Sequence, residues 1–588
     1  MIGPILGKPR NLLVCSLVGA ATVSALALGS CDAKITSAPT LPFFGDVVPL
    51  TTAEVQLILD RAVAAIDSPF LHVAVVDRTG EFLGAVRTTP AGPVEDEDNI
   101  ALSLARTTAY FSNSQAPLSS RTVETLGTFH FPPTFDVPFV PSAVPASSGV
   151  APFPDSVIAP TRTTSGIAGT PQGPLWQINS TNRGANIASP LTVPVTAFNP
   201  GFEYNPSRNI QGLSFPSPGI TLLPGAVPLY KPNSIGVPRL VGGVGAYVRD
   251  NVTVPAEPPN VEAAEFAAIS GATGTGAVGD ENFFFAIPPE GAITIGGILL
   301  PYVKQTTRPA GFGPGPLPVV GTPLTPGRVD PFGYLIGPIA GVDGGPTQTL
   351  SLTEVRTIID QVIASADRTR AQVRLPLGSG AKVIATVVDT RGLILAHFRM
   401  EDTLCDAVDV VPAKARSVVY FCRPGGPLSA TTTRTLANGT VLNFPDGDRW
   451  AGFPTDPTGL NRGIALTTRT LGFLSQPFYP PGIDENGPGP LFNLARLNQE
   501  PVQVDRWGNA APDPGYQNGL TFFPGSVPLY KNGELVGALG VSGDGVEQND
   551  LIAFEGGAGF EPPPELRIDN FTFQGVRLPY LKFPQTPR

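Results

Sequence analysis

The sequence contains few of the side chains that usually carry metal, redox or nucleophilic chemistry. Among its 588 residues are three histidines, two methionines, four cysteines and three tryptophans. No Gly-x-Ser-x-Gly segment occurs, so a Ser-His-Asp hydrolase would lack its usual nucleophile motif. These scarcities favour a binding protein over an enzyme.

Charged residues are also scarce, and their balance is acidic. They make up 15% of the chain, and the formal net charge is −10. The chain therefore lacks the cationic surface that phosphate backbones attract, and we expect no nucleic-acid binding. Hydrophobic residues make up 42%, which is enough for packed cores, whereas the 66 glycines and 67 prolines predict long irregular segments.

The N-terminal segment predicts export. Lys8 and Arg10 precede an apolar run over 11–28, and small residues then lead to Cys31. A charged start, a short apolar core and a small-residue end are typical of a secretory signal. The ending Leu-Gly-Ser-Cys resembles a bacterial lipobox. It implies a signal peptide over 1–31, a lipid on Cys31, and attachment to a membrane of the bacterial cell envelope, on the periplasmic or outer side. The alternative is an ordinary signal peptide in which Cys31 is incidental.

The rest of the chain contains an internal duplication. The segment LTTAEVQLILDRAVAAI, which begins at Leu50, matches LSLTEVRTIIDQVIASA, which begins at Leu350. Each starts with the S/T-x-x-E pattern of a capping box, and apolar residues then recur at helical spacing. Each copy therefore begins with an amphipathic helix that buries one stripe.

The later elements follow in the same order in both copies. Two apolar strands joined by a short Gly-bearing turn come first, and a second helix with an aromatic end follows. APLSSRTVETL from Ala116 then aligns with GPLSATTTRTL from Gly426, before Pro/Gly-rich insertions at about 132–217 and 445–518. Strands in which glycine alternates with apolar residues predict close approach of a ligand, a helix or another subunit. The endings LPYVK and LPYLK are apolar enough to add a strand or a clasp beside each core.

These matches predict a first domain over 45–308, a Gly/Pro-rich linker over 309–349 and a second domain over 350–588; we call the two domains the first and second repeat. The order of RMED, KARSxxxF, PGSVPLYKNGELVGALGVSG and VEQND in the second repeat resembles the GlcG/HbpS haem-binding family and the C-terminal domain of PduO-type cobalamin adenosyltransferases. The resemblance implies an α/β (α+β) fold, with a profilin-like antiparallel sheet of about five strands flanked by helices in each repeat.

The same resemblance implies noncovalent haem as the cofactor. No Cys-x-x-Cys-His segment is present for covalent attachment. The first repeat lacks the RMED and VEQND segments, so we expect the site mainly in the second. The predicted binding residues are His397, Arg399, Met400, Lys414, Arg416 and Tyr420.

Each of these residues also has a structural interpretation. Haem iron is usually held by His, Met, Cys or Tyr, but the odd spacing of His397 and Met400 puts them on opposite faces of a strand, so they cannot share one iron. Met400 would otherwise pack in the core, and His397 would lie at a surface or an interface. The cations Arg399, Lys414 and Arg416 suit ligand carboxylates, or they form an ordinary solvated face.

Cys405 and Cys422 are the two cysteines beyond the signal segment. Because an exported chain meets an oxidising compartment, they predict a disulfide. A helix over about 412–421 would be roughly 15 Å long, and the residues before it could fold back that far.

Three functions remain open at this point. The leading hypothesis is a lipid-anchored protein that binds haem or a similar planar or carboxylate-bearing ligand. A structural or assembly module of the cell envelope, with a homo-oligomer or an envelope protein as its partner, is the rival, because the Pro-rich segments exceed ordinary connections. An enzyme of small organic acid metabolism is the third. In each case we expect the two repeats to pack into one pseudo-symmetric unit through their sheets or their second helices, since a duplicated domain can replace a subunit contact with an internal one.

Overall fold

The structure is a computed structural model, and it describes parts of both repeats. The described residues are 46–88, 95–128, 130–133, 167, 169–176, 178, 220–249, 260–274, 293–316, 321, 324–341, 349–390, 392–422, 433–435, 441–443, 464–476, 478–483, 486–491 and 521–587.

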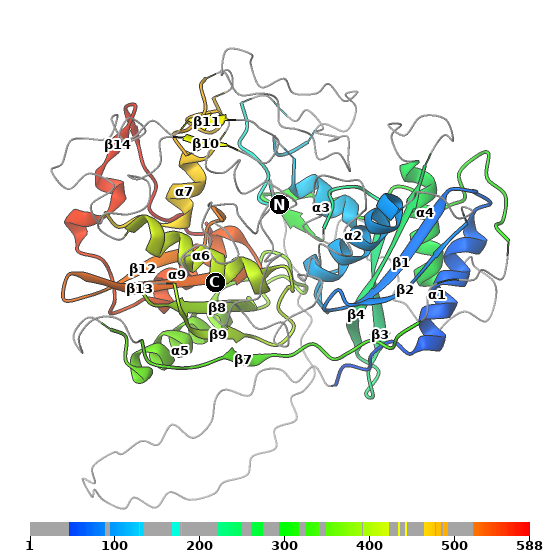
Figure 1. The fold of residues 1–588 in the computed structure, drawn as a ribbon, viewed down its shortest axis with the longest axis horizontal. Coiled ribbons are helices and arrows are strands. Elements are labelled where there is room, and N and C mark those ends of the chain that lie inside the picture. Colours follow the sequence, from blue (N-terminus) through cyan, green and yellow to red (C-terminus); the bar gives the residue numbers. More distant parts are fainter. Residues whose placement is uncertain are drawn as a thin grey trace, which may run out of the picture. The chain divides into compact units, whose positions relative to one another are not determined.

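Two antiparallel sheets with matching strand orders form the centre of the fold (Figure 1). The order is β2-β1-β4-β3 in the first repeat and β9-β8-β13-β12 in the second, where β7 is added beside β9. The strands are β1 (Leu71–Asp77), β2 (Phe82–Arg87), β3 (Ala226–Pro232), β4 (Pro238–Val248), β7 (Gly333–Ile336), β8 (Val383–Val388), β9 (Ile394–Arg399), β12 (Ser526–Lys531) and β13 (Glu534–Gly543). The described sheets thus have four and five strands, where about five were predicted for each.

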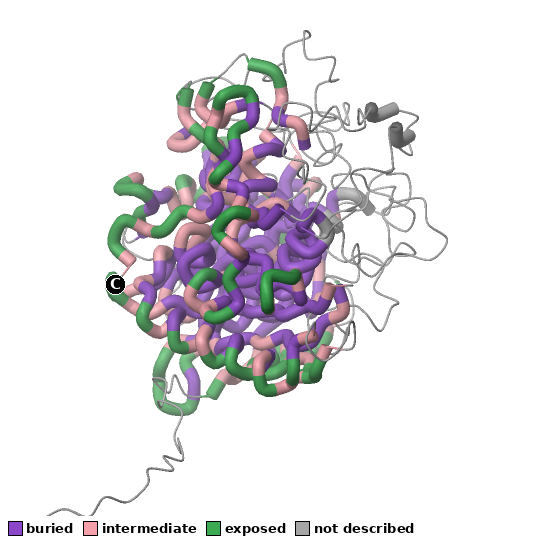
Figure 2. The backbone as a smooth tube through the Cα atoms, turned by 90° about the vertical axis from the view of Figure 1, so that its left-hand side faces the viewer, coloured by how far each residue is buried: buried purple, intermediate pink, exposed green. Residues whose placement is uncertain are grey.

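Helices cover both faces of each sheet, and side chains between these layers form the hydrophobic clusters. Figure 2 shows that the buried residues gather in the interior. In the first repeat, α1 and α4 pack on one face of the sheet and α2 packs on the other. In the second repeat, α5 and α9 pack on one face and α6 packs on the other. Their bounds are α1 (Thr52–Ala65), α2 (Glu95–Phe111), α4 (Val261–Thr273), α5 (Leu352–Arg368), α6 (Ala407–Cys422) and α9 (Val546–Gly556). The predicted mixed α/β fold with antiparallel sheets is confirmed.

Smaller elements complete the described parts. They are α3 (Ser120–Leu126), α7 (Thr468–Leu474), the 3-10 turns η9 (Pro564–Leu566) and η10 (Ile568–Asn570), and the hairpins β5–β6 (Thr294–Ile295, Ile298–Leu299), β10–β11 (Thr433–Thr435, Val441–Asn443) and β14–β15 (Thr572–Phe573, Val576–Arg577).

Both predicted capping boxes are confirmed. The hydroxyls of Thr51 and Ser351 accept from the amide three residues on, and the glutamate there accepts from the cap amide. Each glutamate also forms an ion pair of 2.8 Å with the lysine of the nearby PLYK strand, Lys231 or Lys531. The start of the first helix is therefore tied to the edge strand in each repeat.

The glycine-rich strands allow a helix to lie directly on the sheet. A Cβ atom at Gly243 would lie 2.3 Å from the carbonyl oxygen of Ala105 in α2, and one at Gly540 would lie 2.6 Å from that of Val411 in α6. Of the three alternatives that the glycine pattern left open, a closely packed helix is therefore the one found at these positions.

The two LPYxK endings are clasped by short helices. Thr122 in α3 donates to the carbonyl oxygen of Pro301, and Thr470 in α7 donates to that of Pro579, both at 2.7 Å. These matched bonds make α3 and α7 equivalent. Each ending is therefore held beside its core, and neither ending forms the strand that was the other alternative.

The predicted alignment of 426–436 with 116–126 is consequently wrong. Residues 433–435 form strand β10, and the equivalent of α3 is α7, which lies inside the segment expected to be an insertion. The sequence LTTRT at 466–470 also matches LSSRT at 118–122, and the hydrogen bonds to the chain ending identify it as the counterpart.

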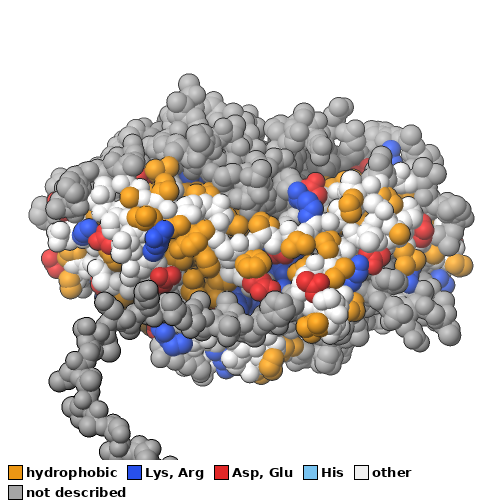
Figure 3. All heavy atoms as spheres, turned by 90° about the horizontal axis from the view of Figure 1, so that it is seen from below, with side chains coloured by type: hydrophobic (Ala, Val, Ile, Leu, Met, Phe, Trp, Pro, Cys, Tyr) orange, Lys and Arg blue, Asp and Glu red, His pale blue; other side chains and the backbone are white. Residues whose placement is uncertain are grey.

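The segment expected to be a linker is hydrogen-bonded to both sheets. Thr325 N donates to Leu83 O of the first repeat, and Ile339 N donates to Leu395 O of the second, both at 2.9 Å. Between these contacts β7 pairs with β9. Hydrophobic and charged side chains are interspersed on the face seen from below (Figure 3). The exposed large apolar side chains of the linker are Val329, Phe332, Tyr334 and Ile339.

A buried ionic network joins the two repeats. The carboxylate of Asp402 lies 2.8 Å from Arg78 of the first repeat and 2.8 Å from Arg374 of the second. Arg78 also pairs with Asp330 at 3.3 Å, and Asp330 pairs with Arg399 at 2.6 Å. Burial alone would raise the pKa of Asp402, but Arg78 and Arg374 hold it well below its usual range.

Neutral contacts surround the ionic network. Cys405 N donates to Tyr110 O at 3.1 Å, and Asn113 Nδ2 donates to Val373 O at 2.9 Å. One hydrophobic cluster contains side chains of both repeats, and residues 45–588 form one compact unit. The expectation that the repeats pack together is therefore confirmed.

Replacing Asp402 by Asn should lower the free energy of unfolding by about 3 to 5 kcal/mol, because it leaves two buried guanidinium groups without their shared anion. Chemical denaturation followed by circular dichroism measures the change. Asp360→Asn, on the exposed face of α5, is the matched control. Equal stabilities for the two variants would show that the network does not hold the repeats together.

Candidate functional site

The predicted binding residues whose side chains are described are all buried. One of them, Arg399, pairs with Asp330 of the linker, which also pairs with Arg78 of the first repeat. Tyr420 lies on α6, but its side chain falls outside the described residues, as does Cys31. Among the residues that the structure describes, none of the predicted binding residues lines the cavity described below.

His397 lies inside the second repeat and not at a surface. Its Nδ1 is 2.7 Å from Thr386 Oγ1, and its side chain is fully buried. Burial, aided by Arg399 and Arg416, lowers the pKa of His397 to about 3, so the imidazole is neutral. Met400 packs in the other hydrophobic layer, which confirms its core interpretation. The two side chains therefore do not share a site.

The predicted cations serve the fold. Lys414 donates to Ser542 Oγ at 3.0 Å and to two backbone carbonyls. Burial lowers the pKa of Lys414 to about 7. Arg416 Nε donates to Gly392 O at 2.8 Å, and burial lowers its pKa to about 9. These contacts contradict the expectation of a solvated helix face.

The predicted disulfide is wrong, since Cys405 and Cys422 are both free and buried. Cys422 ends α6 and Cys405 precedes it, so the 16-residue helix separates them by about 24 Å. A disulfide needs Cα atoms within about 7 Å. Each sulfur has its own partner, Arg399 for Cys405 and the amide of Leu466 for Cys422, both at 3.1 Å. The sequence placed the start of this helix too late.

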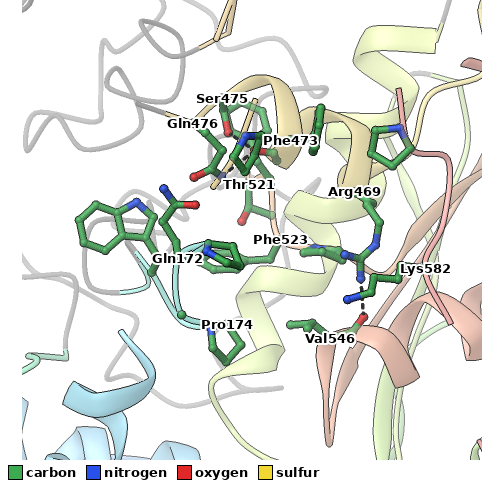
Figure 4. A pocket seen from close by; sticks show the side chains of 18 of the residues that line it. Gln172, Pro174, Arg469, Phe473, Ser475, Gln476, Thr521, Phe523, Val546 and Lys582 are labelled. Atoms are coloured by element: carbon green, nitrogen blue, oxygen red, sulfur yellow. Dashed lines mark hydrogen bonds between the residues drawn. The ribbon is translucent and has the colours of Figure 1, made fainter. Parts of the chain in front are cut away.

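A cavity of about 530 Å³ lies where α7 of the second repeat meets residues 171–176 of the first (Figure 4). Both repeats supply its walls. The aromatic lining residues are Trp176, Phe473, Phe522 and Phe523, and the polar ones include Gln172, Arg469, Gln476, Thr521 and Lys582. Sequence reasoning missed this cavity, because its walls come from an insertion, the unrecognised helix α7 and the chain ending.

One of the two cations at the cavity has a structural role. Arg469 forms an ion pair with the buried carboxylate of Asp550. The first repeat contains the equivalent pair between Arg121 and Glu265, at 2.6 Å. Because both repeats keep the pair, Arg469 belongs chiefly to the clasp around the chain ending.

Lys582 is the more accessible cation. Its side chain is 66% exposed and pairs with Glu547 at 2.5 Å. Within the described part of the chain, Gln476 Oε1 and Thr521 Oγ1 are buried and lack a hydrogen-bond partner. The cavity thus combines aromatic walls with a cation and two polar oxygens that a bound molecule could engage.

The comparison with known families concerns the same part of the chain. Residues 495–558 match the family model described as haem degrading protein HbpS-like. The match lies within the second repeat. The matched segment includes β12, β13 and α9. It also contributes five residues to the cavity wall, namely Thr521, Phe522, Phe523, Pro524 and Val546. The resemblance predicted from the sequence is confirmed.

Two solved structures are similar to part of the chain at low identity. One is a PduOC:heme complex, with 18% identity and a TM-score of 0.20; the aligned region covers 36% of this chain and 93% of the chain in that structure. The other is the Klebsiella pneumoniae protein ORFY, of the family model DUF336, with 16% identity and a TM-score of 0.20. The aligned region covers 37% of this chain and 94% of the chain in that structure. No curated protein matches the chain. Likenesses this weak carry no inference about function.

The described ranges contain no group of three or more His, Cys, Asp or Glu side chains that could hold a metal ion. In the same ranges, no helix is both long enough and apolar enough to cross a membrane.

His72 of the first repeat forms a different kind of cluster. Its Nε2 is 2.8 Å from Glu97 and its Nδ1 is 2.7 Å from Asp98, both at the start of α2. Arg249 pairs with Glu97 and Arg87 with Asp98, each at 3.2 Å. Burial alone would lower the pKa of His72, but the two carboxylates raise it above 6.5. A protonated His72 therefore ties α2 to β1.

This cluster predicts a pH dependence of stability. Because folding raises the pKa of His72, the contribution of His72 to the free energy of unfolding is complete below about pH 6.5. That contribution is lost as the pH rises through the folded-state pKa. Between about pH 6 and pH 9 the unfolding free energy of the native chain should fall as His72 loses its proton, and urea denaturation measures this fall. His72→Gln should remove the contribution of His72 to the fall, and Glu97→Gln should make that contribution smaller. If the fall in unfolding free energy is the same in both variants as in the native chain, His72 is not charged.

Proposed function

We propose that the HbpS-like second repeat binds a planar, carboxylate-bearing ligand of the haem class in the cavity beside α7. The observation that carries the proposal is an aromatic cavity whose wall is partly built from the segment that matches the HbpS-like family. Its volume of about 530 Å³ lies within the roughly 300 to 1,000 Å³ typical of small-molecule sites.

The lining fits a porphyrin ring better than it fits the iron. Trp176, Phe473 and Phe523 offer flat apolar surface, and Lys582 offers a partner for a propionate. Among the described lining residues there is no His, Met, Cys or Tyr, the usual protein ligands of haem iron. Recognition would therefore rest on the ring and its carboxylates, with haem as the expected natural member of the class.

The test is a titration of the full chain with haem and, separately, with iron-free protoporphyrin IX, followed by the Soret band. Both should bind saturably, with affinities within about threefold, because the described wall supplies no iron ligand. Lys582→Met should weaken both by about three- to tenfold, since it removes one charge-assisted bond at a partly exposed site.

Lys531→Met is the matched control, because Lys531 pairs with Glu354 away from the cavity. No saturable change with either porphyrin would refute the proposal. Equal losses in the two lysine variants would refute the assigned location.

We further propose that the chain is held at the bacterial cell envelope by a lipid on Cys31, on the sequence pattern before that residue. In cells, the mature protein should partition into the detergent phase of Triton X-114, and the mass of its N-terminal peptide should include acyl chains. Cys31→Ser should move it to the aqueous phase. An unmodified Cys31 in a processed chain would favour the ordinary signal peptide.

A further inference from the structure

A second cavity adjoins the proposed haem-class site and shares the lining residues Phe473, Pro579 and Leu581 with it. Its volume is also about 530 Å³. It is formed by residues of α7, α9, the turn η10 with the preceding Arg567, the strand β15 and the chain ending. The side chains that matter below are Phe554, Arg567, Asp569, Arg577, Tyr580 and Phe583.

Two phenylalanines form an open aromatic face at this cavity. Phe554 is 40% exposed and Phe583 is 44% exposed, and their ring centroids are 5.4 Å apart. Large apolar side chains that gather at a hollow on the surface usually mark a binding site. A flat ring could pack against this pair with little rearrangement.

The charges at the cavity favour an anion. Asp569 is the only acid among the described lining residues, and it is shared by Arg567 at 2.8 Å and Arg577 at 3.4 Å. Arg567 also covers the ring of Tyr580, 4.6 Å from its centroid. The Arg577 side chain is 73% exposed. Two guanidinium groups with one carboxylate leave a net positive charge, and Arg577 can still donate to a ligand.

The duplication provides an internal comparison. The shared LPYxK ending is flanked by Leu299 and Gln305 in the first repeat and by Arg577 and Phe583 in the second. The matched bonds from α3 and α7 to the two endings show that the backbone is held in the same way. The arginine and the phenylalanine are therefore not required by the clasp.

We propose that this second cavity binds a small aromatic monocarboxylate, with its ring on Phe554 and Phe583 and its carboxylate on Arg577. The site is separate from the haem-class site, because Arg577 and Phe583 line only the second cavity. A molecule of this class has one flat ring and one negative charge, which match the open aromatic pair and the single net positive charge.

The test uses the full chain and 2-naphthoate, whose fluorescence reports binding. Saturable binding is expected, and Arg577→Leu and Phe583→Gln, which restore the residues of the first repeat, should each weaken it about tenfold. The uncharged 2-naphthamide should bind the native chain as weakly as 2-naphthoate binds Arg577→Leu. Arg368→Leu, at an exposed arginine of α5, should bind 2-naphthoate normally.

Thermal unfolding checks that the variants are folded, and a porphyrin titration of the same variants separates the two sites. Unchanged porphyrin binding together with weakened naphthoate binding supports the proposal. Absence of saturable 2-naphthoate binding, or equal affinity in the native chain and both cavity variants, overturns it whether or not porphyrins bind. Complete displacement of 2-naphthoate by a porphyrin would overturn the separation of the sites.

Discussion

The arrangement of the two repeats depends on one buried carboxylate, that of Asp402. It lies between Arg78 of one repeat and Arg374 of the other, and all three side chains are almost fully buried. Taking such ions out of water costs several kcal/mol for each, and only close pairing offsets that cost. A small displacement of one repeat would leave charges unpaired, so the network favours a single docking geometry. The φ angle of Asp402, +63°, lies in the left-handed region, so local backbone preference is overridden there.

Fixed docking has a consequence for the candidate site. Both repeats supply walls of the cavity beside α7, so the shape of this cavity depends on how the repeats are positioned relative to each other. The first repeat contributes Trp176 and its neighbours, although it lacks the family segments that led us to expect the site in the second repeat. On the proposal made above, a repeat that lacks these segments still supplies part of the wall of the site.

The duplication also separates structural residues from those free to serve a ligand. The ion pair Arg121–Glu265 recurs as Arg469–Asp550, with the same threonine clasp beside it. What both repeats keep is required to hold the chain ending on the core. Arg577, which only the second repeat has, contacts Asp569 and lies at the second cavity, so the clasp does not require it.

The sequence alone was enough to predict the local elements. It predicted the capped helices at Thr51 and Ser351, the hairpins, the close packing at the glycine-rich strands and the family resemblance, because each depends on residues near one another in the chain. Tertiary structure decided the rest. Arg399 became part of the ionic network between the repeats, and His397 became buried. The length of α6 separates the two cysteines, and distant segments of the chain together form the cavity. Periodicity cannot distinguish a buried polar partner from a ligand contact, because both require the same residue types; only the contacts between distant parts of the chain decide which one a side chain becomes.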